Sequence, residues 1–198
     1  MSTARLQPPI SVADYLAGEQ DAQRRHEYVE GSIYMLAGAT NAHNRIATNA
    51  TGSLYAQLRG NPCQVFNSDT KVRVQTSTGT RFYYPDAMVA CRQNPDSDTF
   101  QDDPVVIVEV LSQNTRRTDE TEKKDAYCSI ASLRVYLLVE QSSATVTVIR
   151  RTDTGFVAEQ LTGLDAVIPL PEIGVDLPFQ ELYENVDFQP EPSLDPSA

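Results

Sequence analysis

The chain lacks the features that would tie it to a membrane, a secretory route or a disulfide-based scaffold. No apolar stretch approaches the roughly 20 residues needed to cross a bilayer, and no basic region followed by a hydrophobic one opens the sequence. Three widely spaced cysteines, Cys63, Cys91 and Cys128, form no paired-ligand pattern. We therefore expect a cytoplasmic protein with no membrane partner, and buried, reduced thiols rather than disulfides or a zinc site.

Positive charge is also scarce. The 16 Lys and Arg residues face 27 Asp and Glu residues, which gives a formal net charge of −11. Because non-specific affinity for phosphates rests on lysine and arginine, the composition predicts weak non-specific binding to DNA. Basic residues nevertheless gather between residues 116 and 134 and at residues 150–151. A local basic face on an acidic protein is compatible with this distribution.

The length and composition indicate one domain. With 198 residues, of which 40% are hydrophobic and 22% charged, the chain can bury one core and is too short for two comfortable domains. We expect a single domain over residues 1–188. Residues 189–198 are rich in proline and poor in apolar side chains, which predicts a disordered, acidic tail.

Hydrophobic periodicity predicts a mixture of helices and strands. Residues 41–59 form the clearest helix, because apolar residues recur there at intervals of four. Residues 27–36 alternate around Gly31 and predict a β-hairpin or a bent strand pair. The remaining expected elements are a helix at 11–16 capped by Ser11, strands at 64–66, 71–75, 83–91 and 104–111, a helix at 118–128 capped by Thr118, a hairpin of 135–139 with 145–149, and short strands at 156–157 and 167–168.

One acidic residue stands where an apolar residue is expected. Glu109 interrupts the β-branched run of residues 104–111, which is typical of a buried central strand. A buried carboxylate costs several kcal/mol or more unless a positive group meets it. The preceding strand carries a second carboxylate, Asp86, and the following helix carries Lys123 and Lys124. Two carboxylates and a lysine on adjacent elements predict a divalent-metal site.

The expected chemistry follows from the ligand type. Mg²⁺ takes oxygen ligands, such as one or two carboxylates, a carbonyl and several waters. Asp86 and Glu109 could supply the carboxylates, and a strand carbonyl beside Glu109 could complete the set. A metal there would polarise a phosphoryl oxygen and activate water, while a lysine orients the nucleophile or stabilises charge. This is the chemistry of phosphodiester hydrolysis.

Several motifs, in this order and at these spacings, carry a family resemblance. They are residues 26–31, His43, residues 84–86, residues 108–116, and the series Asp119, Lys123 and Tyr127. Over residues 12–151 the chain resembles the Uma-two family of endonucleases, within the PD-(D/E)XK, or restriction-endonuclease-like, superfamily. The resemblance implies an α/β fold: a mixed central β-sheet flanked by helices, here with an additional N-terminal β-hairpin and C-terminal β-strands.

The resemblance also implies residue roles. Asp86 and Glu109 would bind Mg²⁺, with Mn²⁺ as an alternative, and Glu27 would be the accessory acid. The superfamily's lysine two residues after the second acid is replaced here by Leu111, on the same side of the strand as Glu109. Lys123 is the candidate to take that role, and Lys124 is the neighbouring alternative. His43 and Tyr127 are expected beside the site.

Each candidate also has a structural interpretation. Glu109 could be a core acid held in an ion pair, and Asp86 could cap a turn after Pro85. Lys123 with Asp119, or Lys124 with Glu120, could be an ordinary helix-face pair. Glu27 could be structural or peripheral, and His43 could serve capping or packing.

Three functions therefore stay open. The leading one is a Mg²⁺-dependent nuclease acting on DNA. The second is a catalytically inactive nuclease-like module acting in partner binding or oligomerisation, which Leu111 and the acidic balance favour. The third is hydrolysis of a small phosphate ester. The hairpin of residues 135–149 is a candidate dimer surface by analogy with the superfamily.

Overall fold

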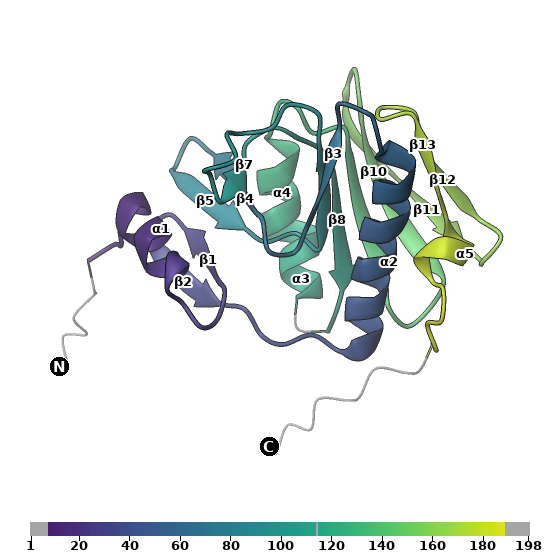
Figure 1. The fold of residues 1–198 in the computed structure, drawn as a ribbon, viewed down its shortest axis with the longest axis horizontal. Coiled ribbons are helices and arrows are strands. Elements are labelled where there is room, and N and C mark those ends of the chain that lie inside the picture. Colours follow the sequence, from purple (N-terminus) through teal and green to yellow (C-terminus); the bar gives the residue numbers. More distant parts are fainter. Residues whose placement is uncertain (1–7, 114, 189–198) are drawn as a thin grey trace, which may run out of the picture.

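Two β-sheets organise the computed structural model, which describes residues 8–113 and 115–188 (Figure 1). The six-stranded sheet is mixed, because β8 and β9 are parallel while its other neighbours are antiparallel. In spatial order it contains β11 (Gly155–Thr162), β10 (Thr145–Thr152), β9 (Val135–Glu140), β8 (Pro104–Leu111), β6 (Ala87–Ala90) and β3 (Gln64–Asn67). The five-stranded sheet contains β2 (Ser32–Met35), β1 (His26–Val29), β5 (Thr80–Tyr83), β4 (Lys71–Gln75) and β7 (Phe100–Gln101).

Helices cover both faces of the six-stranded sheet. The long helix α2 (Asn41–Leu58) lies on one side of β8, and the segment formed by α3 (Arg116–Thr118), the π-helical turn η1 (Asp119–Lys123) and α4 (Lys124–Cys128) lies on the other (Figure 1). Helix α1 (Val12–Gln20) packs at the five-stranded sheet. Strands β12 (Val167–Leu170) and β13 (Val175–Pro178) and helix α5 (Phe179–Leu182) complete the fold beside α2. The predicted mixed sheet flanked by helices is confirmed.

The α2 helix follows its predicted periodicity and positions one end of the cavity described below. Its buried residues, Ile46, Ala50, Leu54 and Leu58, are those predicted from the four-residue spacing. They pack in one cluster with the valines of β8. Thr40 caps the helix, because its Oγ1 accepts the backbone N–H of His43. The first turn of α2 is therefore held in place, and its residue His43 lines the cavity.

The predicted N-terminal hairpin is also confirmed. β1 and β2 pair antiparallel through a turn at Glu30 and Gly31, whose φ angles are 51° and 98°. Two consecutive positive φ values are typical of the primed turns that match strand twist. Gly31 is required there for a second reason, since a Cβ atom would lie 2.5 Å from the Cβ of Pro9. β1 then pairs with β5, and Glu27 Oε1 accepts the backbone N–H of Tyr84, just after β5.

The strand predicted over residues 83–91 is wrong as a single element. β5 ends at Tyr83 in the five-stranded sheet, and β6 begins at Ala87 in the six-stranded one. Pro85 lies between them, and a proline cannot donate to a strand ladder. The connection therefore passes from one sheet to the other, and Asp86 stands at the crossing.

The helix after β8 begins earlier than predicted and contains a π-helical turn. Thr118 lies inside the helix and makes no capping hydrogen bond, whereas Ser112 Oγ accepts the backbone N–H of Thr115. In the predicted hairpin of residues 135–149, β9 is buried between β8 and β10, and its role as a dimer surface stays a prediction. β7, β13 and α5 were not predicted. The predicted tail at residues 189–198 lies outside the described residues.

Two of the three cysteines depart from the expectation of reduced thiols. Cys63, just before β3, and Cys91, just after β6, form a disulfide, while Cys128 is free. The pairing follows from the antiparallel register, because Gln64 lies opposite Ala90 and the two cysteines extend that register by one position. A sequence separation of 28 residues gave no sign of this contact.

Candidate active site

Glu109 lies on the face of β8 that turns toward η1 and α4. Ile107 and Leu111 share this face, as the two-residue alternation predicts. The Glu109 side chain is buried, and its Oε1 accepts the Tyr127 hydroxyl at 3.0 Å and lies 3.4 Å from Lys123 Nζ. Burial raises the pKa of Tyr127 well above its usual value, so this hydroxyl keeps its proton and donates. Leu111 stands where the superfamily has its lysine, and here Lys123 brings an ammonium group to Glu109 from the following helix instead.

Lys123 lies among three carboxylates. Its Nζ is 2.9 Å from Glu27, 3.4 Å from Glu109 and 3.4 Å from Asp119. Burial alone lowers the pKa of Lys123, but the charges of these acids outweigh it and raise the pKa well above its usual value. The ammonium therefore remains charged. Both Lys123 and Asp119 come from the π-helical turn, a local geometry often found at functional sites.

The acids outnumber the buried cation, and this imbalance shifts their titration. Burial raises the pKa of Glu109 well above its usual value, and the charges of Asp119, Asp86 and Glu27 add to it, while Lys123 opposes them. Burial likewise raises the pKa of Asp119, again against the pull of Lys123. Asp119 Oδ1 is buried and makes no hydrogen bond among the described residues, but it lies 3.4 Å from Lys123 Nζ in an ion pair. The cluster thus holds more acids than Lys123 alone can neutralise, which favours the protonated forms of Glu109 and Asp119 as long as no further cation is bound.

Asp86 reaches the same region from the crossing between β5 and β6. Because Ala87 pairs with Val108, Asp86 lies next to the Glu109 position of β8. Its Oδ2 accepts the backbone N–H of Val110 at 2.7 Å and lies 3.3 Å from His43 Nε2. Burial lowers the pKa of His43, but the hydrogen bond to Asp86 and the charges of Asp86 and Asp119 raise it on balance. Asp86 and His43 thus form a second polar pair beside the Lys123 cluster.

A cavity of about 300 Å³ joins these two groups. Asp86, Glu109, Asp119, Lys123 and His43 all line it, so both predicted metal-binding carboxylates open into one space. The opposite wall is formed by the connection from β2 to α2 and by neighbouring loops. The other lining residues are Arg25, Leu36, Ala37, Gly38, Ala39, Thr40, Asn44, Ala47, Ser68, Tyr84, Val110, Ser112 and Thr115.

The structure separates the remaining candidates. Glu27 is buried and meets Lys123 from β1, and Tyr127 meets Glu109, so both lie behind the cavity wall. Lys124 is half-buried and is not among the described residues that line the cavity. Asp119 was not predicted as a site residue. Two signals were available, its place in the family series with Lys123 and Tyr127 and its position four residues before Lys123, but an exposed helix pair has the same spacing.

A divalent cation fits the donor chemistry of this cavity. Its walls present carboxylate oxygens, which hard cations bind, and an excess of negative charge that a cation would balance. Within residues 8–113 and 115–188, no three His, Cys, Asp or Glu side chains are already placed to hold a metal together. Water molecules would complete the shell of a cation held by the carboxylates that line the cavity.

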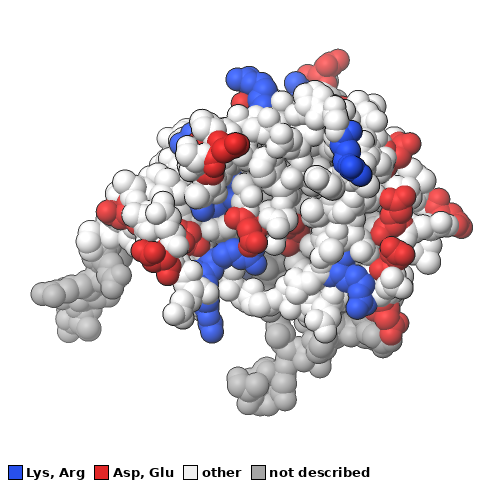
Figure 2. Space-filling view, viewed as in Figure 1, with Lys and Arg blue, Asp and Glu red and all other residues white. Residues whose placement is uncertain are grey.

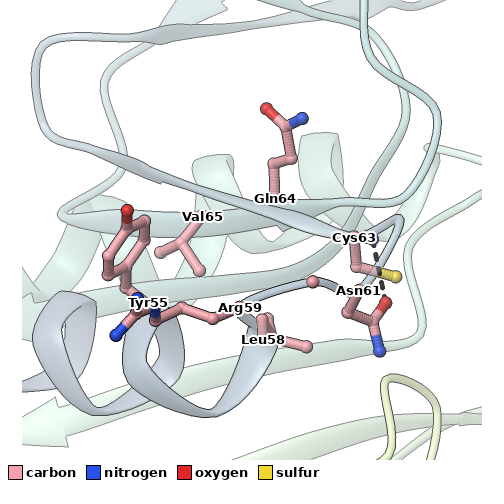
Figure 3. Close-up of a pocket in the computed structure, with 8 residues that line it drawn as sticks. Tyr55, Leu58, Arg59, Asn61, Cys63, Gln64 and Val65 are labelled. Carbon is pink, nitrogen blue, oxygen red and sulfur yellow. Dashed lines mark hydrogen bonds between the residues drawn. The ribbon is translucent and has the colours of Figure 1, made fainter.

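A larger pocket, of about 410 Å³, lies at the other end of α2 (Figure 3). It is lined by Tyr55, Leu58, Arg59, Gly60, Asn61, Cys63, Gln64 and Val65. Of these described residues, Arg59 alone carries a charge. The Cys63 backbone N–H donates to Asn61 Oδ1 inside it. This pocket therefore offers no set of groups for acid, base or metal chemistry.

A mixed sheet flanked by helices, with acids at one end of its central strand, defines a restriction-endonuclease-like α/β protein. A solved structure has the same fold: the crystal structure described as "a putative nuclease belonging to DUF820", from Anabaena variabilis, aligns with a TM-score of 0.70 and 18% identity, over 88% of this chain and 98% of that chain. The model of the Uma2 family, described as "Putative restriction endonuclease", matches residues 12–180. The chain belongs to the Uma2 family, which confirms the resemblance predicted from the motifs.

Two proteins of Synechocystis sp. are also similar to this chain. The uncharacterized protein slr1290 is 30% identical over 149 residues, which cover 75% of this chain and 77% of the relative. The uncharacterized protein sll1609 is 31% identical over 135 residues, which cover 67% of this chain and 75% of the relative. In the described part of the chain, no helix is both long and apolar enough to cross a membrane. The cytoplasmic location stays a prediction.

Proposed function

We propose that this protein is a metal-dependent endonuclease that hydrolyses phosphodiester bonds in DNA. The observation that carries the proposal is that Asp86 and Glu109 line one cavity while the Lys123 ammonium lies 3.4 Å from Glu109. Membership of the Uma2 family and the nuclease-like fold support the reaction class. Metal, substrate and residue roles are the parts that the proposal adds.

The proposed roles follow from the contacts. Asp86 and Glu109 would hold Mg²⁺ or Mn²⁺, which when bound polarises a phosphoryl oxygen and lowers the pKa of water. Lys123 is charged and stabilises negative charge that develops on the phosphate. Glu27 and Asp119 hold the Lys123 ammonium in place, and Tyr127 orients Glu109. Lys124, which is not among the cavity-lining residues, has no part in this arrangement.

The surface charge indicates that a nucleic-acid substrate would be held mainly by contacts at the cavity, and not by long-range attraction to the whole protein. Lys and Arg side chains alternate with Asp and Glu over the face shown in Figure 2. A net charge of −11 weakens long-range attraction of a polyanion, so binding depends on contacts at the cavity and on the cation itself. Arg25, which lines the cavity and is partly exposed, is one such contact. We expect weak affinity for DNA that rises when Mg²⁺ is present.

Cleavage of single- and double-stranded DNA, with Mg²⁺ or Mn²⁺, tests the proposal. Asp86→Asn keeps an acceptor for the Val110 N–H but loses the charge, so cleavage should fall at least about a hundredfold. The control Asp153→Asn removes an exposed acid from the turn between β10 and β11 and should cleave like the wild type. Equal activity in all three proteins would exclude the assignment.

A second candidate is a catalytically inactive module that acts in partner binding or oligomerisation. The observation that favours it is that Leu111 replaces the superfamily lysine while three carboxylates hold Lys123. The same samples separate the two. Saturating Mg²⁺, at about 100 times its Kd, should raise the melting temperature of the nuclease by about 5–10 °C, and Asp86→Asn should abolish the shift. An inactive module would show neither cleavage nor shift.

A homodimer also stays a prediction, which sedimentation of the free protein tests.

A further inference from the structure

His43 and Asp86, rather than the two carboxylates, are the polar side chains in the cavity that already lie at a separation suited to binding one cation. His43 Nε2 lies 3.3 Å from Asp86 Oδ2, and both side chains line the cavity with only 14% and 13% of their surface exposed. The backbone of Val110, whose N–H donates to Asp86 Oδ2, also interacts with the His43 ring. The imidazole therefore lies beside both Asp86 and Val110, the residues that flank Glu109 across and along the sheet. The ring therefore faces the oxygen atoms that a cation would use.

Glu109 is engaged differently. Its Oε1 is bound to the Tyr127 hydroxyl and lies beside the Lys123 ammonium. Among the described residues, no three acidic, histidine or cysteine side chains are placed together for a metal. Asp86 and His43 are thus the preformed part of the site, and Glu109 joins from the adjacent wall.

We propose that His43 Nε2 is a ligand of the cation held by Asp86, and that the cavity therefore prefers a transition-metal dication such as Mn²⁺ to Mg²⁺. The inference rests on the proposed function, because it names a further ligand of the same cation. It assigns His43 a direct role, whereas the sequence placed it only beside the site.

Geometry and ligand chemistry support this assignment. Two ligand atoms bound to one octahedral cation at about 2.1 Å lie roughly 3 Å apart, close to the separation of His43 Nε2 and Asp86 Oδ2. Imidazole nitrogen is a good ligand for transition metals, whereas Mg²⁺ favours carboxylate, carbonyl and water oxygens. On the other side of the ring, Nδ1 is buried without a hydrogen-bond partner among the described residues. Nε2 can bind a cation only after it gives up the proton shared with Asp86, either to Nδ1 or to solvent, so the bound ring is neutral and carries its proton on Nδ1.

Pulsed electron paramagnetic resonance of bound Mn²⁺ tests the inference directly, because a nitrogen ligand couples to the metal's unpaired electrons. The wild-type protein should show the coupling of one imidazole nitrogen. His43→Gln should lose it, and His26→Gln should retain it. His26 is the matched control, since it is the chain's other histidine and binds Glu19 away from the cavity.

Calorimetric titration supplies the selectivity. Loss of a partner outside the ligand shell costs about 10–100-fold in metal affinity, so loss of a direct ligand should weaken Mn²⁺ binding at least about tenfold. Mg²⁺ affinity should change much less, and the preference for Mn²⁺ should shrink in His43→Gln alone.

The outcomes are distinguishable. Mn²⁺ that binds to the wild type without nitrogen coupling, and is lost in Asp86→Asn, overturns the role of His43 but leaves the proposed carboxylate site standing. Mn²⁺ that does not bind, or binds equally well to Asp86→Asn, overturns the proposed function as well. If His43→Gln fails to fold, the spectra of the wild type and of His26→Gln still decide the role of His43.

Discussion

The two faces of β8 have opposite characters although they alternate along a single strand. Val106, Val108 and Val110 point to α2 and lie in a cluster of apolar side chains. Ile107, Glu109 and Leu111 point to η1 and α4, where Glu109 meets a tyrosine, a lysine and the charges of three further acids. The same backbone thus supports an entirely apolar core on one side, and on the other an apolar core into which a charged cluster is set at Glu109.

This difference separates what stabilises the fold from what could perform chemistry. Burial of the valine face is favourable by itself, at about 25 cal/mol per Å² of apolar surface. The charged face is costly, because buried ion clusters are often no more stable than apolar replacements of the same shape. A cluster with more acids than bases, opening into a cavity, is therefore better explained by a bound cation than by stability.

The largest effect should come from the central cation of the charged face. Lys123→Met leaves Glu27, Glu109 and Asp119 without their shared partner, which should destabilise the fold by about 3–5 kcal/mol near pH 7. The loss should shrink at low pH as the acids become protonated. Urea unfolding measures it, with Lys124→Met as the control, for which we expect a change within about 0.5 kcal/mol. Equal effects of the two substitutions would contradict the comparison.

Much of this comparison was visible in the sequence because it depends on local periodicity. The two-residue alternation of β8 placed Leu111 on the face of Glu109, and the four-residue spacing in α2 identified its buried side. The contact between Lys123 and Glu109 was predicted from the family-like spacing, and the structure places the two residues within reach of each other.

The rest depends on contacts between distant segments. Asp86 meets His43 because the chain crosses between sheets at Pro85 and because α2 packs at the end of β8, and neither event has a local signature. The pairing of Cys63 with Cys91 depends on the register of two strands in the same way. Asp119 looked like an ordinary helix acid, since a π-helical turn cannot be read from periodicity that assumes 3.6 residues per turn.

A smaller effect is expected on the apolar face. Val108→Ala removes two buried methyl groups that face α2 and should destabilise the fold by about 2 kcal/mol. Because no charge is involved, the loss should be the same at pH 5 and pH 8 in urea unfolding. A loss that varied with pH would show that the two faces are coupled through the strand, and would break the distinction drawn between them.

The smallest effect, and the one with a distinctive sign, should come from Glu109→Gln in metal-free buffer. The pKa of Glu109 is raised in the folded state, mainly by burial, so its contribution to stability is complete below the unfolded-state pKa of about 4.3 and is lost as pH rises through the folded-state pKa. Glutamine resembles the protonated acid at every pH. The variant should therefore match the wild type near pH 4. As pH rises from the unfolded-state pKa through the folded-state pKa of Glu109, the variant should become more stable than the wild type, by about 1 kcal/mol. If the difference in the free energy of unfolding between the two proteins stays constant from pH 4 to pH 8, Glu109 is a core acid whose charge is already balanced. The charged face would then need no cation.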